Sequence, residues 1–173
     1  SRYVDGIVAR TFAHETVVQL ARHATVPVIN GLSDLEHPCQ ILSDLMTIQE
    51  KKGKLAGLTV AYVGDANNVA NSLMLACAIV GIEFRIASPG GYEPGDEALA
   101  AARRLKGHVT VTGDVAQAVT NADVIYTDVW TSMGQEKEAA RRLRDFAGYQ
   151  VSRQTLELAR KDALFMHPLP AHH

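Results

Sequence analysis

The chain has 173 residues, of which 47% are hydrophobic and 21% charged, and its formal net charge is −2. Such a composition is typical of a soluble globular protein, and the scattered basic residues favour neither a nucleic-acid-binding nor a membrane-surface role. The apolar runs, such as residues 73–81, are too short to span a bilayer, and Cys39 and Cys77 lack metal-ligand spacing. We therefore expect a cytoplasmic protein without a disulfide framework or a metal site.

The first and last residues predict that this is an internal piece of a longer polypeptide, or a trimmed chain. The sequence opens with Ser1 rather than methionine, and it stops at His173 directly behind a proline-rich segment. Its length suits one complete domain together with part of another.

The first fifty residues predict two short strands and two helices. The strands are expected at residues 6–9 and 26–30, and the helices at 14–24 and 38–51. Pro38 suits the first turn of its helix, because the missing N–H costs nothing there. Two sets of apolar residues recur at helical spacing. They are Val17, Leu20, Ala21 and Ala24 in the first helix, and Ile41, Leu42, Leu45 and Ile48 in the second.

A domain boundary is predicted at the polar, glycine-bearing segment 51–57, which divides residues 1–50 from residues 51–173. Strands and helices alternate regularly after it. The strands are predicted at 58–63, 84–87, 108–112, 124–128 and 163–166, and the helices at 68–80, 96–106, 115–121, 137–146 and 152–160. This alternation indicates an α/β fold, with a parallel sheet covered by helices on both faces.

Asp128 ends the predicted strand 124–128 and is the first candidate site residue. Ligands of open α/β sheets bind at the carboxyl ends of the strands, where a carboxylate can hold a cationic substrate. Ser132 and Met133 follow on a polar loop, and Gly134 allows a tight turn. The alternative is that Asp128 only caps the segment that follows.

The segment Gly64-Asp65-Ala66-Asn67-Asn68 joins a strand to a helix. It lacks the G-x-G-x-x-G fingerprint of dinucleotide-binding domains, which argues against a nicotinamide cofactor. One asparagine can cap the helix. Because two adjacent asparagines exceed what capping requires, we expect one of them to face a ligand.

Three further clusters carry possible site residues. His37 and Gln40 lie three apart at a helix start and share one face, where both can hydrogen-bond a planar acyl group, although a lone histidine is often structural. Arg10 ends an apolar strand and requires an anionic partner, either a local carboxylate or a bound phosphate. His-Pro-Leu-Pro at residues 167–170 is either a plain turn or a stiff support for ligand-binding carbonyls.

The order and spacing of these motifs resemble those of ornithine carbamoyltransferases, within the aspartate/ornithine carbamoyltransferase family. The matching motifs are His-Pro-Cys-Gln at 37–40, Gly-Asp-Ala-Asn-Asn at 64–68, Asp128 to Glu136, and His-Pro-Leu-Pro-Ala-His at 167–172. The resemblance covers essentially the whole chain. It implies a Rossmann-like ornithine-binding domain over residues 51–173, and the end of a carbamoyl-phosphate domain with its linking helix over 1–50.

The resemblance also implies a reaction: transfer of the carbamoyl group of carbamoyl phosphate to the side-chain amine of L-ornithine, giving L-citrulline and phosphate, without a cofactor or metal. Arg10, His37 and Gln40 would be the catalytic residues. Further contacts to carbamoyl phosphate would come from Pro38, Cys39, Pro168 and Leu169. The ornithine-binding residues would be Asn68, Asp128, Ser132 and Met133. A role in arginine metabolism and a homotrimer, or a multiple of it, are also implied.

The sequence departs from the family pattern in two respects. The ornithine enzymes carry cysteine at the position of Pro168, whereas the aspartate-using relatives resemble this chain there. The role of that thiol therefore does not transfer. Ornithine remains the better substrate, because Asp128 would repel the second carboxylate of aspartate. The Ser-x-Arg-Thr phosphate loop and the closing C-terminal helix are not in these 173 residues, so we expect negligible activity from them alone.

Three other functions are compared with this one. A relative acting on another amine or amino acid is the nearest, but it would be expected to alter the Ser-Met-Gly loop at 132–134. A nicotinamide-dependent oxidoreductase lacks its glycine fingerprint here. A non-catalytic protein with a binding role would account for Pro168 and for the missing phosphate loop.

Overall fold

The computed structural model describes residues 2–131 and 135–171. Within these residues the strands are β1 (Ile7–Arg10), β2 (Val28–Leu32), β3 (Thr59–Val63), β4 (Glu83–Ala87), β5 (Val109–Thr112), β6 (Val124–Thr127) and β7 (Leu164–Met166). The helices are α1 (His14–His23), α2 (Pro38–Lys52), α3 (Asn68–Val80), α4 (Asp96–Arg104), α5 (Val115–Val119), the 3-10 helix η1 (Glu136–Glu138), α6 (Ala139–Asp145) and α7 (Arg153–Glu157).

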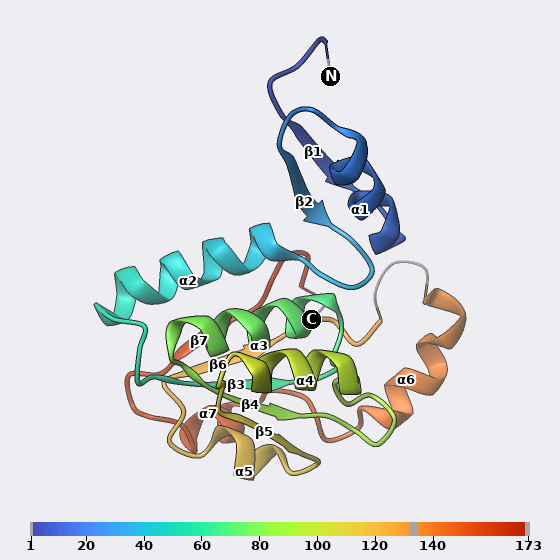
Figure 1. Cartoon of the computed structure of the whole chain (residues 1–173). Coiled ribbons are helices and arrows are strands. Elements are labelled where there is room, and N and C mark those ends of the chain that lie inside the picture. The colour runs from blue at the N-terminus through green and yellow to red at the C-terminus, as the bar shows by residue number, and fades with distance from the viewer. Residues whose placement is uncertain (1, 132–134, 172–173) are drawn as a thin grey trace.

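The strands form two parallel sheets. One contains β1 and β2, and the other has the order β5-β4-β3-β6-β7. The smaller sheet and α1 form a separate unit, from which α2 runs across the larger sheet domain (Figure 1). The predicted α/β fold with a parallel sheet is therefore correct.

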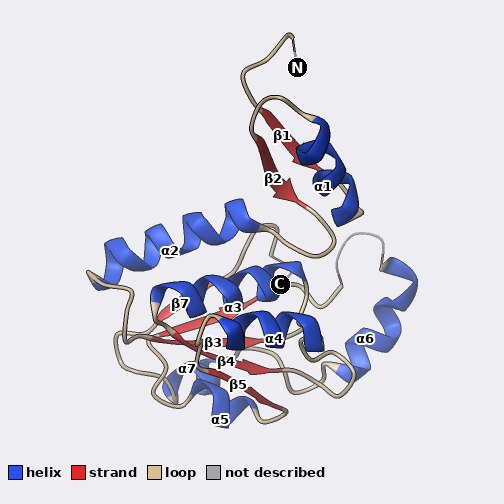
Figure 2. Cartoon of the chain, in the orientation of Figure 1, coloured by secondary structure: helices blue, strands red, loops and turns tan. Residues whose placement is uncertain are grey.

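Alternation along the strands divides the core of the larger sheet between its two faces. Val60, Tyr62 and Tyr126 point toward a cluster that includes side chains of α2, α3 and α4. Ala61 and Ile125 point the opposite way, into a smaller cluster that includes Val119 of α5. The helices accordingly cover both faces, with α3 and α4 on one and α5 and α7 on the other (Figure 2).

The helix α2 matters most for the position of the site. Pro38 begins it, and Gly53 ends it in a left-handed conformation with φ of 74°. Its Ile41 and Ile48 side chains are buried against the larger sheet domain. At its C-terminal end, Lys52 Nζ donates to the backbone carbonyl of Asp162 and forms an ion pair with the Asp162 carboxylate. The helix is therefore fixed to the larger sheet domain along its length.

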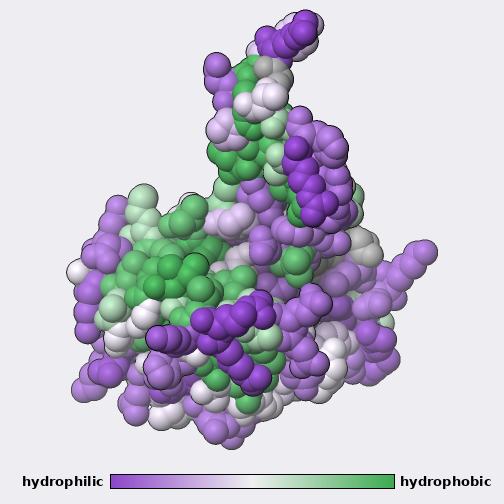
Figure 3. Space-filling model, viewed as in Figure 1, coloured by the Kyte–Doolittle hydropathy of each residue, from purple (hydrophilic) through white to green (hydrophobic). Residues whose placement is uncertain are grey.

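Two predicted apolar faces are wrong in part. Leu42 is 67% exposed and Leu20 is 38% exposed, although both follow the helical apolar spacing. Met46, one turn after Leu42 in α2, is also exposed, and Figure 3 shows a hydrophobic area over α2 and α3. Helical spacing identifies an apolar stripe, but it does not identify which edge of a wide stripe is covered.

Most predicted boundaries lie within a few residues of the observed ones, and the largest errors are at helix ends. The predicted helix 137–146 divides into η1 and α6, and the predicted helix 152–160 contains only the five-residue α7. The predicted helix 96–106 ends at Arg104, because Lys106 has a positive φ of 58° before Gly107. The left-handed backbone at Lys106 is incompatible with continuing the helix.

Candidate functional site

The carboxyl ends of strands from both sheets meet at one polar cleft of about 560 Å³. Arg10 ends β1, Asp65 follows β3, and Asp128 follows β6. Because the strands of each sheet are parallel, these ends lie together although they are far apart in sequence. The cleft is lined by Arg10, Thr11, Phe12, Leu32, Ser33, Asp34, His37, Gln40, Asp65, Ala66, Asn67, Asn68, Val69, Gly91, Tyr92, Glu93, Asp128, Val129, Gln135, Arg141, Arg142, Pro168, Leu169 and Pro170.

Most of the sequence-predicted site residues line this cleft. They are Arg10, His37, Gln40, Asn68, Asp128, Pro168 and Leu169. Pro38 and Cys39 begin α2 without lining the cleft, and the Cys39 thiol donates to the Asn30 carbonyl at 3.4 Å. Ser132 and Met133 lie outside the described residues. A second hollow of about 670 Å³ beside α1 is lined by none of the predicted site residues.

His37 is held at the start of α2 by its backbone. Its N–H donates to Ser72 Oγ on α3 at 2.8 Å, while its ring Nδ1 is buried and has no hydrogen-bond partner among the described residues. Burial, and then the positive charge of Arg10, lower the pKa of His37, whereas Asp128 and Asp44 act in the opposite direction. The imidazole is therefore neutral at pH 7.

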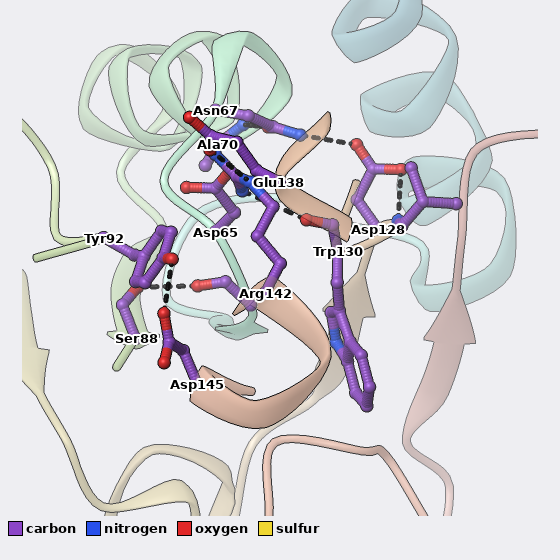
Figure 4. Close-up of polar contacts among 12 residues, drawn as sticks. Asp65, Asn67, Ala70, Ser88, Tyr92, Asp128, Trp130, Glu138, Arg142 and Asp145 are labelled. Carbon is purple, nitrogen blue, oxygen red and sulfur yellow. Dashed lines mark hydrogen bonds and ion pairs between the residues drawn. The ribbon is translucent and has the colours of Figure 1, made fainter. Parts of the chain in front are cut away.

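Asp128 is fixed by two hydrogen bonds at the tip of β6. Its Oδ1 accepts from the Val129 backbone N–H at 2.7 Å, and its Oδ2 accepts from Asn67 Nδ2 at 2.8 Å (Figure 4). The Asn67 Oδ1 also accepts from the N–H groups of Val69 and Ala70, so this asparagine caps α3 and orients Asp128 together. Neither oxygen of Asp128 is engaged by a cation of the protein in the described chain.

The adjacent Asn68 has a different partner. Its Nδ2 donates to the backbone carbonyl of Ser33 at 2.8 Å, which links α3 to the loop after β2. The side chain still lines the cleft. The Asn68 Oδ1 also accepts from the Val69 N–H at 3.0 Å, so the N–H groups at the start of α3 are not satisfied by Asn67 alone, and both asparagines line the cleft.

A second buried cluster lies beside Asp128 (Figure 4). Arg142 of α6 pairs with Asp65 at 2.6 Å and donates to the Trp130 carbonyl at 3.0 Å, and its guanidinium lies 5.0 Å from the centre of the Tyr92 ring. Burial raises the pKa of Asp65, and Arg142 opposes that rise. Sequence reasoning missed this cluster, because Asp65 and Arg142 are separated by 77 residues and no local pattern pairs them.

Asp44 is the third residue that the sequence analysis missed. It is 7% exposed on α2, and its carboxylate accepts from Gln40 Nε2 at 3.1 Å and from the Tyr126 hydroxyl at 2.7 Å. The spacing of four residues between Gln40 and Asp44 on one helix is a signal that could have found the first contact. No comparable signal exists for Tyr126.

No resident cation is indicated at the site. Among residues 2–131 and 135–171, no group of three or more histidine, cysteine, aspartate or glutamate side chains is arranged to hold a metal ion. No helix in this part of the chain is long and apolar enough to cross a membrane. The arrangement instead offers a neutral imidazole, an arginine, amides and a carboxylate around one cavity. Such groups can bind and orient polar substrates.

The fold and the cleft define a ligand-binding α/β protein in which parallel strands of two sheets end at a shared polar cavity. Family models match both of its parts: the carbamoyl-P binding domain of aspartate/ornithine carbamoyltransferases over residues 1–50, and their Asp/Orn binding domain over residues 56–173. The chain belongs to the aspartate/ornithine carbamoyltransferase family.

Individual relatives agree with this assignment. The chain is 52% identical to an ornithine carbamoyltransferase of Anoxybacillus flavithermus and 55% identical to one of Listeria monocytogenes, with 99% of the chain aligned to each. The solved ornithine carbamoyltransferase of Pyrococcus furiosus has 51% identity and a TM-score of 0.93 over 99% of the chain. The chain spans 56% of the length of each of these three relatives.

Proposed function

We propose that the protein containing these residues transfers the carbamoyl group of carbamoyl phosphate to the side-chain amine of L-ornithine. The products are L-citrulline and phosphate. The observation that carries this proposal is that His37, from the first α/β unit and its linking helix, and Asp128, from the larger sheet, line one cleft. The limits of the two family models, at residues 50 and 56, support dividing the chain near residue 50.

The proposed roles follow the chemistry of each side chain. Arg10 and the neutral His37 donate hydrogen bonds to the carbonyl oxygen, and Gln40 holds the carbamoyl amide. Asp128 binds the ornithine α-amino group, and Asn68 binds its α-carboxylate. Ser132 and Met133, outside the described residues, are proposed to place the side-chain amine. Pro168 and Leu169 contribute apolar lining and backbone carbonyls, whereas Pro38 and Cys39 act by starting α2.

In this reaction the neutral side-chain amine of ornithine attacks the carbonyl carbon, and a C–N bond forms. The bond from that carbon to the phosphate oxygen then breaks, and the leaving phosphate takes up the proton that the amine loses. The negative charge that develops on the carbonyl oxygen is stabilised by Arg10 and His37. Loss of one such donor typically costs about 3 kcal/mol, or about a hundredfold in rate.

Ornithine is favoured over aspartate as the amine substrate because Asp128 lines the cleft and is paired with no cation of the described chain. A substrate with a second carboxylate would be repelled by Asp128, whereas a cationic α-amino group is attracted. A dinucleotide is disfavoured at the same place. The Asn67 side chain already accepts from the N–H groups of Val69 and Ala70 that would bind a phosphate.

The remaining parts of the proposal concern the whole protein. We propose a homotrimer, or a multiple of it, that acts in arginine metabolism in the cytoplasm, with negligible activity from the 173 residues alone. Of the arginines that line the cleft, Arg142 is paired with Asp65, and Arg141 is paired with Glu138 and Asp145. Arg10 has no such pair among the described residues, so it is the one proposed to attract a phosphate dianion. Strong phosphate binding requires several convergent donors, so further residues of the parent protein are proposed to supply them.

The test is citrulline formation from carbamoyl phosphate and ornithine by the full-length protein. Asp128→Ala is expected to raise the KM for ornithine by about a hundredfold, because a charge-assisted hydrogen bond contributes up to about 3 kcal/mol. Asp96→Ala, which removes an exposed carboxylate on α4 outside the cleft, serves as the matched control. An intact protein that forms no citrulline would refute the proposed function.

A further inference from the structure

Asp44 does not line the substrate cleft, and both of its carboxylate oxygens accept hydrogen bonds. Oδ1 accepts from Gln40 Nε2 at 3.1 Å, and Oδ2 accepts from the Tyr126 hydroxyl at 2.7 Å. The residue is 7% exposed, whereas its partner Gln40 lines the cleft. Asp44 therefore contacts Gln40, a proposed substrate-binding residue, without lining the cleft itself.

The protonation states of Tyr126 and Asp44 determine which groups donate in these two hydrogen bonds. Tyr126 is fully buried, and burial followed by the charge of Asp44 raises its pKa, so its hydroxyl remains protonated and donates. Burial raises the pKa of Asp44, whereas the hydrogen bonds from Tyr126 and Gln40 oppose that rise by stabilising the carboxylate, and an ionised carboxylate can only accept. The second donor to Asp44 must therefore be the NH2 of Gln40, because the amide oxygen would meet a carboxylate oxygen without a proton between them.

This contact fixes the orientation of the Gln40 amide. With Nε2 directed to Asp44, the group that remains available on Gln40 is the acceptor Oε1. The carbamoyl group carries an NH2, which is a donor, so an acceptor is the complementary partner. If the Gln40 amide were reversed, its own N–H groups would face those of the carbamoyl group, and the hydrogen bond would be lost.

The anchor for Asp44 comes from the strand that also carries Asp128. Tyr126 lies within β6. Asp128 is two residues after Tyr126 and directly follows the last residue of that strand. On the other side, Asp44 and Gln40 lie on α2, which begins directly after His37. The Tyr126–Asp44–Gln40 chain therefore connects residues proposed to bind the amino acid with residues proposed to bind the carbamoyl group.

We propose that Asp44 is a positioning residue which, held by Tyr126, orients Gln40 so that its Oε1 accepts a hydrogen bond from the carbamoyl NH2. Through this orientation the protein distinguishes a carbamoyl group from an acyl group of the same shape. The inference rests on the proposed function and identifies the residues that set its specificity for the carbamoyl donor.

The test compares the binding of carbamoyl phosphate and acetyl phosphate to the full-length protein by calorimetry. Acetyl phosphate carries a methyl group in place of the NH2, so the ratio of the two dissociation constants isolates the contact to Gln40. Asp44→Asn is expected to reduce the preference for carbamoyl phosphate about fivefold, since one hydrogen bond is worth about 1 kcal/mol. The affinity for acetyl phosphate is expected to stay unchanged.

Further variants separate positioning from folding. Tyr126→Phe keeps the ring and removes only the hydroxyl, so a smaller reduction of about threefold is expected if Asp44 is less firmly held. Thr127→Val is the matched control, because the Thr127 hydroxyl is also buried in β6 but donates to the Val63 carbonyl at 2.7 Å instead. In a Gln40→Ala background, the preference is already lost, and Asp44→Asn is expected to have no further effect on it.

The outcomes are distinguishable from those of the citrulline assay. If Asp44→Asn and Tyr126→Phe weaken both ligands equally, Asp44 is only structural and the inference is overturned, while citrulline formation by the intact protein still supports the proposed function. Equal affinity of the intact protein for both phosphates overturns the inference as well. If Asp44→Asn does not fold, Tyr126→Phe decides alone.

Discussion

The chemical state of His37 depends on the charged groups that surround its ring. Burial and Arg10 disfavour the imidazolium, whereas Asp128 and Asp44 favour it, and the net result is a lowered pKa. A neutral imidazole can donate one hydrogen bond to a carbonyl oxygen without placing a full positive charge beside Arg10. The lowered pKa therefore preserves the form of His37 that the proposed reaction uses at pH 7.

A titration of His37 followed by histidine-selective NMR tests this balance in the full-length protein. We expect the midpoint below the usual histidine value of 6.5. Arg10→Ala removes an influence that lowers the pKa, so the midpoint is expected to rise. Asp128→Asn removes one that raises the pKa, so the midpoint is expected to fall further. Shifts in the reverse directions would contradict the described electrostatics.

The same titration has a consequence for stability. Since the pKa of His37 is lower in the folded state, the unfolded state takes up the proton first as the pH falls below 6.5. The neutral ring therefore makes its full contribution to the free energy of unfolding above pH 6.5. That contribution is lost as the pH falls through the pKa of His37 in the folded state. His37→Asn is expected to remove this part of the pH dependence of unfolding.

At the scale of elements, α6 is attached to the larger sheet by the buried Arg142 and, at its C-terminal end, by Phe146, which packs on Tyr92 and Trp130. The Arg142 side chain is 7% exposed and connects Asp65, after β3, with the Trp130 carbonyl, which precedes residues 132–134. A second acidic partner, Glu138, lies 3.3 Å from it. A short helix with few buried apolar residues relies on such a buried polar contact for its position.

Arg142→Met is expected to destabilise the protein by about 3 kcal/mol in urea-induced unfolding, because it leaves the Asp65 carboxylate largely buried without its cation. Without Arg142, the pKa of Asp65 rises further above its usual value, so the loss of stability is expected to increase as the pH rises from 4 to 7. The double variant Asp65→Asn with Arg142→Met is the control. It should recover part of the stability, and a further loss instead would exclude an uncompensated carboxylate as the cause.

The sequence predicted the alternation of strands and helices because that order depends on local apolar patterns and turn residues. It also placed Asp128 at a strand end and His37 at a helix start, and both positions agree with the structure. The partners of these residues depend on contacts between distant segments. Asn67 lies 61 residues before Asp128, and Tyr126 lies 82 residues after Asp44, so local patterns did not reveal either contact.

At the scale of the whole molecule, apolar burial is unequal between the two parts. In the larger sheet, Val60, Ala61 and Ile125 are fully buried. In the smaller unit, only Ala9 and Val17 are buried among the described apolar residues, and Val8 is 69% exposed. The smaller unit also has two edge strands and no central one. Its local stability therefore depends on few contacts, including the Asn68 bond to the Ser33 carbonyl.

Hydrogen exchange of the 173-residue polypeptide, measured by mass spectrometry, tests this inequality. Peptides that cover β3 and β6 are expected to exchange only through global unfolding, because both strands are hydrogen-bonded on both sides and buried on both faces. Peptides that cover β1 and β2 are expected to exchange at least about a hundredfold faster through local opening. The strand β5 provides the internal control. Like β1 it is an edge strand, but it belongs to the larger sheet. If β5 is as weakly protected as β1, the edge position of the strand rather than the small core explains the fast exchange. Equal protection of β1 and β3 would show that the two parts unfold as one cooperative unit.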